Sequence, residues 1–380
     1  MNRNPKIMIV AGEVSGDMHA ARLVEAITEQ TSGASFFGIG GESMRKCGVK
    51  TVYDVEDMAV MGISEVLRKM TFFRRALNKM TEIAMEQKPD CVVLVDYPGF
   101  NMRLATRIHK LGIKTVYYIS PKVWAWNQSR IPKMARVLNR LITIFPFERK
   151  YFENTGLQVD YVGHPLVDQA KASLAEPLQD LAWNGEPRIA ILPGSRTHEI
   201  ARILPVMCEA AKRLELIRPA SGFAIATPSP AIESTVRNVL ATQKRIPSRL
   251  SVITGKTHQV LRQARAAMVA SGTATLDASL MRCPMVIAYK VGILTSLLAH
   301  VLLHIEHVGL TNIIAGQEIC RELLQEKLTA TALTNSIIPL IDDTSIRNQM
   351  LKDLDAVNSL LGEGNCAQSA AKSVIDTIFT

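Results

Sequence analysis

The chain has 380 residues, of which 47% are hydrophobic and 21% are charged. These proportions exclude a disordered chain, and the length exceeds what one hydrophobic core usually supports, so two domains of about 150–200 residues are expected. The formal charge of +9 favours anionic partners, which include phosphorylated metabolites, nucleic acid and an anionic membrane face.

Neither export nor a membrane span is predicted. The chain starts with MNRNPKIMIVAGE, which enters a predicted strand at once and lacks the apolar run of an export signal. The longest uncharged run, Val291–Ile305, is shorter than the ~20 residues of a membrane span. The six cysteines form no CxxC pair, so reduced thiols are expected rather than disulfides or a structural zinc site.

Strands and helices alternate through most of the chain, which is typical of a doubly wound α/β sheet. Strands in the first half are predicted at Lys6–Val10, Ser35–Gly38, Cys91–Val95, Thr115–Ile119, Leu141–Ile144 and Asp160–Val162. Strands in the second half are predicted at Arg188–Leu192, Gly222–Ala226, Leu250–Ile253, Ala267–Ala270 and Met285–Ala288. Strand patterns fade after Gly316, and the last helices are predicted at Thr344–Leu361 and Cys366–Thr380.

The junction between the halves is predicted within Val167–Pro187, which ends in a polar Asn-Gly-Glu-Pro turn. One domain is expected to comprise residues 1–170, joined by a terminal helix at about 362–380 that crosses back onto it. The other is expected to comprise residues 171–361.

Four predicted strands end in tight turns that carry Gly, Ser or Asp and lead into helices. These turns are Ala11–Asp17, Asp96–Asn101, Pro193–Arg196 and Ser271–Asp277. In an open parallel sheet such turns lie at the carboxyl edge of the strands, where helix N-termini point free N–H groups at anions. Since two turns fall in each half, we expect two Rossmann-like, doubly wound domains that face each other across a cleft.

The first turn suits a substrate that approaches the backbone. Gly12 and Gly16 leave room for that approach, and Ser15 or Asp17 can cap the predicted helix Met18–Gln30. The same residues would also serve as turn and cap residues alone.

The second turn offers a candidate general base. A buried strand leads into Asp96, and Pro98-Gly99 breaks the chain just after it. A carboxylate at this edge can accept a proton from a substrate hydroxyl. An aspartate that only stabilises its turn would give the same pattern.

The two turns of the second half suit a diphosphate. Arg196 precedes a helix predicted to begin near Glu199, and its guanidinium offers a fixed fork of donors, although a surface ion pair would use the same group. The turn Ser271–Thr275 has small side chains that leave N–H groups open, and Asp277 could reach ribose hydroxyls. A helix N-cap followed by an acidic residue in the first turn would account for the same residues without a ligand.

Two other patterns have functional and structural interpretations. His300, His304 and His307 have a spacing that could hold a metal, but no HExxH motif is present, and histidines packed on a helix face are the better interpretation. The stretch Met61–Met80 mixes apolar and basic residues, as an interfacial membrane helix does. An ordinary amphipathic helix with a basic solvent face fits that stretch equally well.

These motifs, in this order, resemble the lipid-A-disaccharide synthase family, which comprises inverting glycosyltransferases of the GT-B architecture. The resemblance covers almost the whole chain, and the VWAW and GHPLVD blocks are its most specific parts. The matching blocks are AGEVSGD at Ala11–Asp17, MAVMGISEVL at Met58–Leu67, DYPGFN at Asp96–Asn101, SPKVWAWNQSR at Ser120–Arg130, PFE at Pro146–Glu148, VGHPLVD at Val162–Asp168, LPGSR at Leu192–Arg196, SGTATLD at Ser271–Asp277, CPMVIAYK at Cys283–Lys290 and NIIAG at Asn312–Gly316.

The resemblance implies a reaction. Members of the family join the 2,3-diacylglucosamine unit of a UDP-activated donor to the 6-hydroxyl of 2,3-diacylglucosamine 1-phosphate, which gives UDP and the β-1,6-linked disaccharide of lipid A biosynthesis. Carried onto this sequence, the resemblance makes Asp96 the general base and lets Arg196 hold the diphosphate. It implies neither a metal nor another cofactor. The residues that it assigns to substrate and nucleotide binding are Gly12, Glu13, Ser15, Gly16, Asp17, Gly194, Ser195, Glu199, Ser271, Gly272, Thr273, Ala274, Asp277, Tyr289 and Asn312.

Because both substrates are acylated, the resemblance favours membrane contact by Met61–Met80. A cytoplasmic enzyme peripherally bound to the inner face of the cytoplasmic membrane is expected, and a homodimer is compatible with the resemblance. Trp124 and Trp126 would line the acyl or acceptor side of the cleft, although core packing is equally open to them. The expected membrane-contact residues are Val66, Leu67, Met70, Phe72, Phe73, Arg74 and Arg75.

Two positions depart from the family pattern. Asp277 stands where members usually carry Glu, and Thr311 stands where they usually carry Pro. The shorter acid has less reach toward ribose, and Thr311 changes a loop beside the expected nucleotide.

Three alternatives compete with this interpretation. A GT-B transferase or epimerase that acts on a soluble UDP-sugar would keep the fold without lipids. A non-catalytic protein that binds nucleic acid would use the positive charge but would leave the four turns idle, and the basic residues show no nucleic-acid motif. A nicotinamide-dependent oxidoreductase is disfavoured because no GxGxxG motif is complete.

Overall fold

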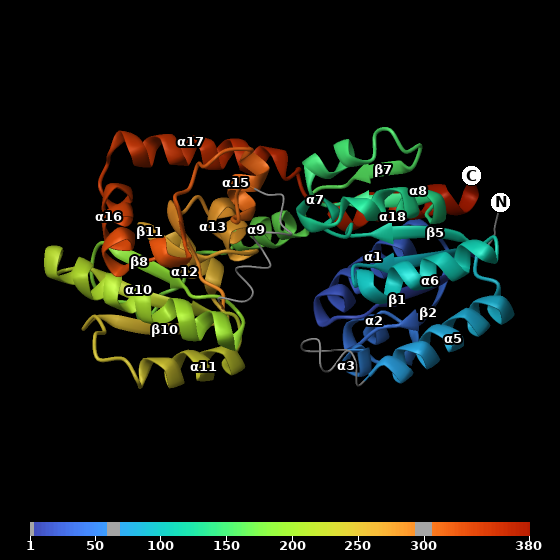
Figure 1. Ribbon diagram of the computed structural model, residues 1–380, viewed down its shortest axis with the longest axis horizontal. Helices are drawn as coiled ribbons and strands as arrows, with labels where there is room; N and C mark the ends of the chain where they lie inside the picture. The colour runs from blue at the N-terminus through green and yellow to red at the C-terminus, as the bar shows by residue number, and fades with distance from the viewer. Residues whose placement is uncertain (1–3, 59–68, 293–305) are drawn as a thin grey trace. The chain divides into compact units, whose positions relative to one another are not determined.

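The computed structural model describes residues 4–58, 69–292 and 306–380 (Figure 1). The chain divides into two compact units. Unit 1 comprises Met1–Pro165 and Glu363–Thr380, and unit 2 comprises Leu166–Gly362. Each unit has its own parallel sheet with helices packed against it.

Unit 1 contains a seven-stranded sheet in the order β3-β2-β1-β4-β5-β6-β7. Its central strands β1 and β4 are almost wholly apolar and buried, as expected for a parallel sheet that is covered on both faces. The strands are β1 Lys6–Ala11, β2 Ser35–Ile39, β3 Lys50–Tyr53, β4 Cys91–Val95, β5 Lys114–Tyr118, β6 Arg140–Thr143 and β7 Gln158–Tyr161.

The helices of unit 1 include one from the far end of the sequence. Helix α18 packs on α1 and β5, and Figure 1 shows this red helix among the blue and green elements of unit 1. The Cys366 thiol at its start donates to the Gly163 carbonyl at 3.2 Å. The helices are α1 Val14–Gln30, α2 Glu42–Lys46, α3 Val55–Met58, α5 Met70–Gln87, α6 Pro98–Lys110, α7 Val123–Trp126, α8 Ile131–Val137 and α18 Cys366–Phe379, with 3-10 helices η1 Gln128–Arg130 and η2 Pro146–Tyr151.

Unit 2 contains a six-stranded sheet in the order β10-β9-β8-β11-β12-β13, which repeats the doubly wound arrangement of unit 1. The strands are β8 Arg188–Leu192, β9 Gly222–Thr227, β10 Leu250–Thr254, β11 Ala266–Ala270, β12 Met285–Tyr289 and β13 Glu322–Leu324. The helices are α9 Pro165–Ala175, α10 Thr197–Ile217, α11 Pro230–Leu240, α12 Thr257–Gln263, α13 Ala274–Leu280, α15 Leu310–Ala315, α16 Ala330–Ile341 and α17 Ser345–Leu360, with the 3-10 helix η3 Gln325–Lys327.

The predicted α/β, doubly wound class is confirmed by both sheets, but two strands were missed. The expectation that strands end before Gly316 is wrong, because β13 pairs with β12 beyond that point. Strand β3 has four residues and β13 has three, and each lies at the edge of its sheet. Segments this short contain too few residues to establish a period-2 pattern.

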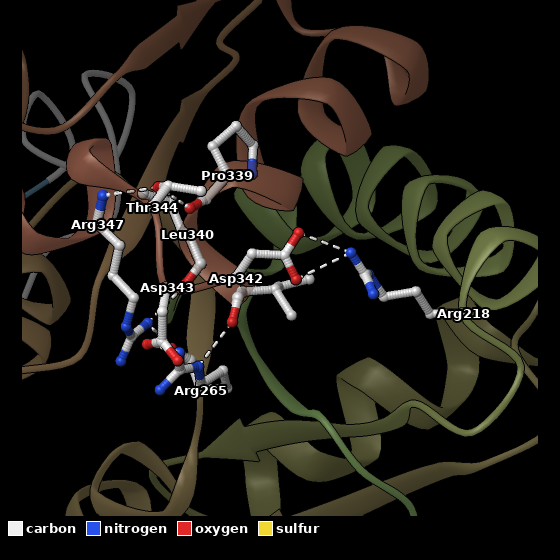
Figure 2. A network of polar contacts seen from close by, with 9 residues as sticks. Arg218, Arg265, Pro339, Leu340, Asp342, Asp343, Thr344 and Arg347 are labelled. Carbon is white, nitrogen blue, oxygen red and sulfur yellow. Dashed lines mark hydrogen bonds and ion pairs between the residues drawn. The ribbon is translucent and has the colours of Figure 1, made fainter.

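A network of arginines and aspartates lies at the amino ends of the strands of unit 2 (Figure 2). Arg218, at the end of α10, donates to both carboxylate oxygens of Asp342, at 2.9 and 2.7 Å. Arg265, just before β11, pairs with Asp343 and donates to the carbonyl of Ile341, the last residue of α16. Arg347 of α17 donates in turn to the Arg265 carbonyl at 2.6 Å. The network ties α10, β11 and the α16–α17 turn together.

Candidate functional site

The four predicted turns lie beside the point in each sheet where the strand order reverses. In unit 1, β1 and β4 are neighbours, and the turns Ala11–Asp17 and Asp96–Asn101 follow them. In unit 2, β8 and β11 are neighbours, and the turns Pro193–Arg196 and Ser271–Asp277 follow them. Doubly wound sheets bind ligands at the carboxyl edge of this reversal point. Each unit therefore carries a pair of turns where its fold places a binding site.

The two turns of unit 1 touch each other. A Cβ atom on Gly12 would stand 2.2 Å from the Tyr97 ring, so only glycine leaves room for that ring. Asp96 and Tyr97 have φ angles of 47° and 49°, a region that L residues other than Gly rarely adopt. Two consecutive residues of this kind store backbone strain, which is concentrated at functional sites in many proteins.

Surrounding polar groups hold this strained backbone in place. The Asn101 amide donates to the carbonyls of Val95 and Asp96, at 3.2 and 2.8 Å, and its side chain is fully buried. The Tyr117 hydroxyl donates to the same Asp96 carbonyl. These bonds fix the direction in which Asp96 leaves the end of β4.

The Asp96 carboxyl group has a pKa above its ordinary value. Burial raises this pKa, while the Tyr97 N–H and the charge of Lys122 oppose the rise. A carboxylate that is more basic than usual is better suited to take a proton from a hydroxyl at neutral pH. The geometry and the pKa therefore fit the predicted general base, and that role stays a prediction.

Further titratable residues, to which the sequence assigned no role, follow neighbouring strands at the same edge. Glu148 is 2% exposed and accepts hydrogen bonds from Trp124 Nε1 and the Phe145 N–H, both at 3.2 Å. Burial raises its pKa to about 8. Burial lowers the pKa of His164 to about 4, and the charges of His19 and Lys122 act in the same direction. Several of these residues lie in the quoted SPKVWAW, PFE and GHPLVD blocks, whose letters alone do not show burial.

Asp17 is buried and caps a different helix from the one expected. Its carboxylate accepts hydrogen bonds from the N–H groups of Gly41, Ser43 and Met44, at 2.6, 3.0 and 3.2 Å, at the start of α2. Helix α1 itself begins at Val14 after Glu13, and no side chain caps it. The predicted cap by Ser15 or Asp17 is therefore wrong, since Asp17 connects α1 to α2. Glu13 and Ser15 are exposed at the start of α1, and Gly16 is buried there.

In unit 2, an ion pair occupies the turn after β8. Arg196 Nη1 lies 2.9 Å from Glu199 Oε1, and the Arg196 side chain is 72% exposed. Gly194 has a φ of 108°, and a Cβ atom there would stand 3.0 Å from Glu199 Oε2. The pKa of Tyr289 is raised by burial and by the Glu199 charge, against the charge of Arg196. Four residues of the predicted site therefore interact here, and Ser195 is exposed beside them. They are Gly194, Arg196, Glu199 and Tyr289.

The turn after β11 leaves its backbone open. Gly272 has a φ of 141°, and a Cβ atom there would meet nothing within 4 Å. Ser271 donates its hydroxyl to the Val308 carbonyl at 2.7 Å, and Thr273 is the N-cap residue of α13, which begins at Ala274. Asp277 Oδ1 lies 2.8 Å from His258 Nε2, so a ribose contact by Asp277 would share the carboxylate with this histidine.

Asn312 and Thr311 have structural partners. The Asn312 amide is fully buried, donates to Cys320 O and Glu322 Oε1, and accepts from the N–H groups of Ile319 and Cys320. These four bonds use the full capacity of an amide, so the structure does not support the predicted nucleotide contact by this side chain. Thr311 donates its hydroxyl to the Thr275 carbonyl at 2.9 Å, which ties α15 to α13.

The expected membrane-contact residues have different exposures. Met70 is 40% exposed, and Arg74 and Arg75 are exposed on α5. Phe72 and Phe73 are half-buried and pack against the core of unit 1. The segment that contains Val66 and Leu67 lies outside the described residues.

Phe72 and Trp124 each pack against other aromatic rings. Phe72 has its ring centroid 5.7 Å from that of Tyr53. Trp124 is 5% exposed and has its ring centroid 5.1 Å from that of Phe147. Core packing, one of the two roles considered for Trp124, is therefore the one that the structure shows.

Metal sites and membrane spans can be assessed only for the described parts of the chain. Within those parts, no group of three or more His, Cys, Asp or Glu side chains could hold a metal ion. His300 and His304 of the histidine pattern lie outside them. None of the described helices combines the length and the apolar character that crossing a bilayer requires.

Comparison with known sequences identifies the family. A family model described as lipid-A-disaccharide synthetase matches residues 7–375. The lipid-A-disaccharide synthase of Anaeromyxobacter sp. (strain K) is 38% identical over 372 residues, which cover 97% of this chain and 97% of that protein. The enzyme of the same name from Geobacter sulfurreducens is 36% identical over 380 residues, which cover 99% and 98%.

Comparison with solved structures identifies the fold. A putative UDP-N-acetylglucosamine 2-epimerase from Listeria monocytogenes has a TM-score of 0.64 at 15% identity, over 96% of this chain and 94% of that one. The calicheamicin glycosyltransferase has a TM-score of 0.61 at 14% identity, over 99% of both chains. These similarities show the fold class that the chains share, two Rossmann-like domains of the GT-B type. With the sequence matches, they confirm the resemblance seen in the motifs: the chain belongs to the lipid-A-disaccharide synthase family, the glycosyltransferases of lipid A biosynthesis.

Proposed function

We propose that this glycosyltransferase condenses UDP-2,3-diacylglucosamine with 2,3-diacylglucosamine 1-phosphate, giving the β-1,6-linked disaccharide 1-phosphate and UDP. The observation that carries the proposal is Asp96, which a strained and hydrogen-bonded turn places at the reversal point of unit 1 with a raised pKa. Membership of the family supports the choice of substrates.

Unit 1 supplies the base in this proposal. Asp96 accepts the proton of the acceptor 6-hydroxyl while that oxygen forms a bond to the anomeric carbon of the donor sugar. The bond from that carbon to the diphosphate oxygen breaks, and its electron pair leaves with UDP. Attack on the face opposite the leaving group inverts the anomeric centre, which gives the β linkage.

Unit 2 holds the leaving group in this proposal. Arg196 uses one N–H group on Glu199, and the remaining N–H groups of its guanidinium suit diphosphate oxygens. The open backbone at Gly272 allows a phosphate to approach closely. A UDP-GlcNAc 2-epimerase from Neisseria meningitidis, solved with UDP-GlcNAc bound, has the same fold with a TM-score of 0.64 at 12% identity, over 98% of this chain and 100% of that one. Its ligand supports a UDP-sugar donor.

Helix α5 brings the enzyme to its acylated substrates in this proposal. Arg74 and Arg75 are exposed on α5, and guanidinium groups near an anionic lipid surface contribute about 1 kcal/mol each. The double variant Arg74→Gln/Arg75→Gln should therefore sediment less with vesicles that contain phosphatidylglycerol. Sedimentation equal to that of the wild type would exclude α5 as the membrane contact.

The central experiment incubates the enzyme with both acylated substrates and identifies the lipid products by mass spectrometry. Wild-type enzyme should form the disaccharide 1-phosphate and UDP, and Asp96→Asn should reduce turnover by about 10²–10⁴-fold while UDP affinity changes little. Asp376→Asn, at an exposed aspartate of α18, is the matched control. Absence of the disaccharide would refute the proposed reaction, and full turnover by Asp96→Asn would remove Asp96 from the role of base.

A further inference from the structure

We infer that a pocket between α5 and α6, beside the Asp96 turn, holds one acyl chain of the acceptor, and that Arg74 and Arg103 at its rim face the acceptor's anionic group. The inference rests on the proposed function for the identity of this glycolipid. It assigns a binding site to residues for which the sequence predicts membrane contact or no role in binding.

The pocket is a cavity of about 400 Å³. That volume falls in the range of about 300–1,000 Å³ in which proteins bind small molecules. The lining residues are Met70, Phe73, Arg74, Leu77, Tyr97, Gly99, Phe100 and Arg103. Most of these side chains are apolar, so the interior offers an extended hydrocarbon chain contacts of the kind found in a protein core.

Regular helix geometry builds the walls. Met70, Phe73 and Leu77 lie on one face of α5, since residues three and four positions apart share a helix face. That face packs against α6, where Phe100 is 5% exposed. The ring centroids of Phe73 and Phe100 lie 6.5 Å apart. Phe73 therefore forms part of a wall inside unit 1.

Two guanidinium groups stand among the lining residues. Arg74 and Arg103 are both exposed, one on α5 and one on α6. Arg103 Nη1 donates to the Gly99 carbonyl one turn earlier, which holds its side chain along the pocket. An apolar interior with cationic groups at its exposed edge is complementary to an anionic amphiphile. A neutral lipid would offer neither guanidinium group an opposite charge.

Tyr97 connects the pocket to the candidate base. Its ring lines the pocket, lies 6.4 Å from the Phe100 ring, and fills the space that Gly12 leaves open. Asp96 is the preceding residue. A chain held in this pocket would keep its own sugar close to the Asp96 carboxylate. The acceptor fits this position because its sugar donates the hydroxyl proton and carries the phosphate.

A direct binding experiment tests the pocket without requiring transfer. Decyl phosphate, kept below its micellar concentration, serves as the anionic single-chain probe, and decanol serves as its uncharged counterpart. Isothermal titration should show that wild-type enzyme binds decyl phosphate more tightly than decanol. The double variant Arg74→Gln/Arg103→Gln should lose about tenfold in affinity for decyl phosphate and keep its affinity for decanol.

A second variant narrows the pocket without disturbing its walls. A Cβ atom at Gly99 meets nothing within 4 Å, so Gly99→Leu should fold and place its side chain in the space that the chain would occupy. Its affinity for both probes should fall by about tenfold or more. Lys110→Gln, at an exposed lysine on the same helix, is the control that should retain wild-type affinity. Equal affinity in all variants, or no binding of decyl phosphate, would overturn the pocket.

Kinetics separate failure of the pocket from failure of the proposed function. With the acylated substrates, Gly99→Leu should raise KM for the acceptor and leave its kcat at saturation unchanged. Disaccharide formation with an unaltered acceptor KM would refute the pocket and leave the function standing. Decyl phosphate binding with the expected variant pattern, but no disaccharide from the wild type, would refute the function and leave the pocket standing.

Discussion

The two sheets of this protein share a strand order but differ in what they place at the reversal point. Unit 1 places strained residues there, Asp96 and Tyr97, among buried titratable groups. Unit 2 places glycines with positive φ and an exposed arginine there, at Gly194, Gly272 and Arg196. A general base gains from a raised pKa, which partial burial gives Asp96, whereas a diphosphate is favoured by free N–H groups and a cation. The same strand order thus carries different residues and backbone conformations at its two reversal points.

At the amino edge of the unit 2 sheet, where no ligand is expected, arginines have structural roles. There Arg218, Arg265 and Arg347 satisfy carboxylates and carbonyls within the protein (Figure 2). The arginine at the carboxyl edge, Arg196, is exposed and pairs with Glu199, three residues along the chain. The same residue type therefore stabilises the fold at one edge and is accessible to a ligand at the other.

The largest expected effect is a pH dependence of stability that arises from the burial of Glu148 in unit 1. Its pKa of about 8 lies above the value of 4.5 of an ordinary glutamate. Between these two pH values the folded chain holds a proton that the unfolded chain has lost, so the free energy of unfolding should fall as pH rises, by roughly 3–5 kcal/mol in total. Glu148→Gln should lack this slope in urea unfolding measured from pH 4.5 to 8.

A matched variant controls for the charge change itself. Glu153→Gln removes an exposed carboxylate close by in the sequence and should keep the wild-type slope. A Glu148→Gln protein whose stability follows the wild type across this pH range would show that Glu148 is ionised in the folded state.

The next prediction concerns the arginine network at the amino edge of the unit 2 sheet. Arg347 is 8% exposed and donates to the backbone carbonyls of Arg265 and Leu340. Arg347→Met should lower the free energy of unfolding by about 2–3 kcal/mol, because the buried Leu340 carbonyl and the partly buried Arg265 carbonyl lose a charged donor. UDP affinity below the melting temperature should stay unchanged. A fall in UDP affinity without a loss of stability would connect this edge to the ligand instead.

A somewhat smaller effect is expected for Arg196, at the carboxyl edge of the same sheet. Arg196→Gln should raise the Kd for UDP by about 10–100-fold, since it removes charge-assisted hydrogen bonds to the diphosphate. The free energy of unfolding should change little, because this side chain is 72% exposed. Arg213→Gln, which also removes an exposed arginine paired with a glutamate, serves as the control. An unaltered Kd in Arg196→Gln would exclude the arginine from the nucleotide site.

The smallest effects compare the glycines of the two turns. Gly12→Ala would place a Cβ atom against the Tyr97 ring, so turnover should fall by about tenfold at constant UDP affinity. Gly194→Ala strains a residue with a φ of 108° beside Glu199, so UDP affinity should fall by a similar factor. If Gly12→Ala lowered UDP affinity and Gly194→Ala lowered only turnover, or if both variants had the same effect, the separate roles proposed for the two units would be refuted.

The sequence predicted the parts of this molecule that depend on local pattern. Buried strands such as Cys91–Val95 appear as apolar runs, and the Gly- and Asp-bearing turns mark where they end. The paired reversal points follow because a doubly wound sheet places such turns together. Burial and partner choice depend on distant residues and could not be read in the same way.

Particular residues show where local pattern was insufficient. Asp17 looked like the cap of its own helix but caps α2, more than twenty residues further along the chain. Asn312 was expected to bind the nucleotide but is fully buried, with its amide saturated. The unusual pKa values of Glu148 and His164 arise from packing, which no letter of the PFE or GHPLVD block reveals.

The return of α18 to unit 1 has a consequence for biosynthesis. On the ribosome, unit 2 can emerge and collapse while unit 1 still lacks the helix that covers α1 and β5. Unit 1 would then mature last, and until it did, its uncovered apolar surface would be a target for chaperones. An incompletely translated chain would thus be recognisable for quality control before it could act on a lipid.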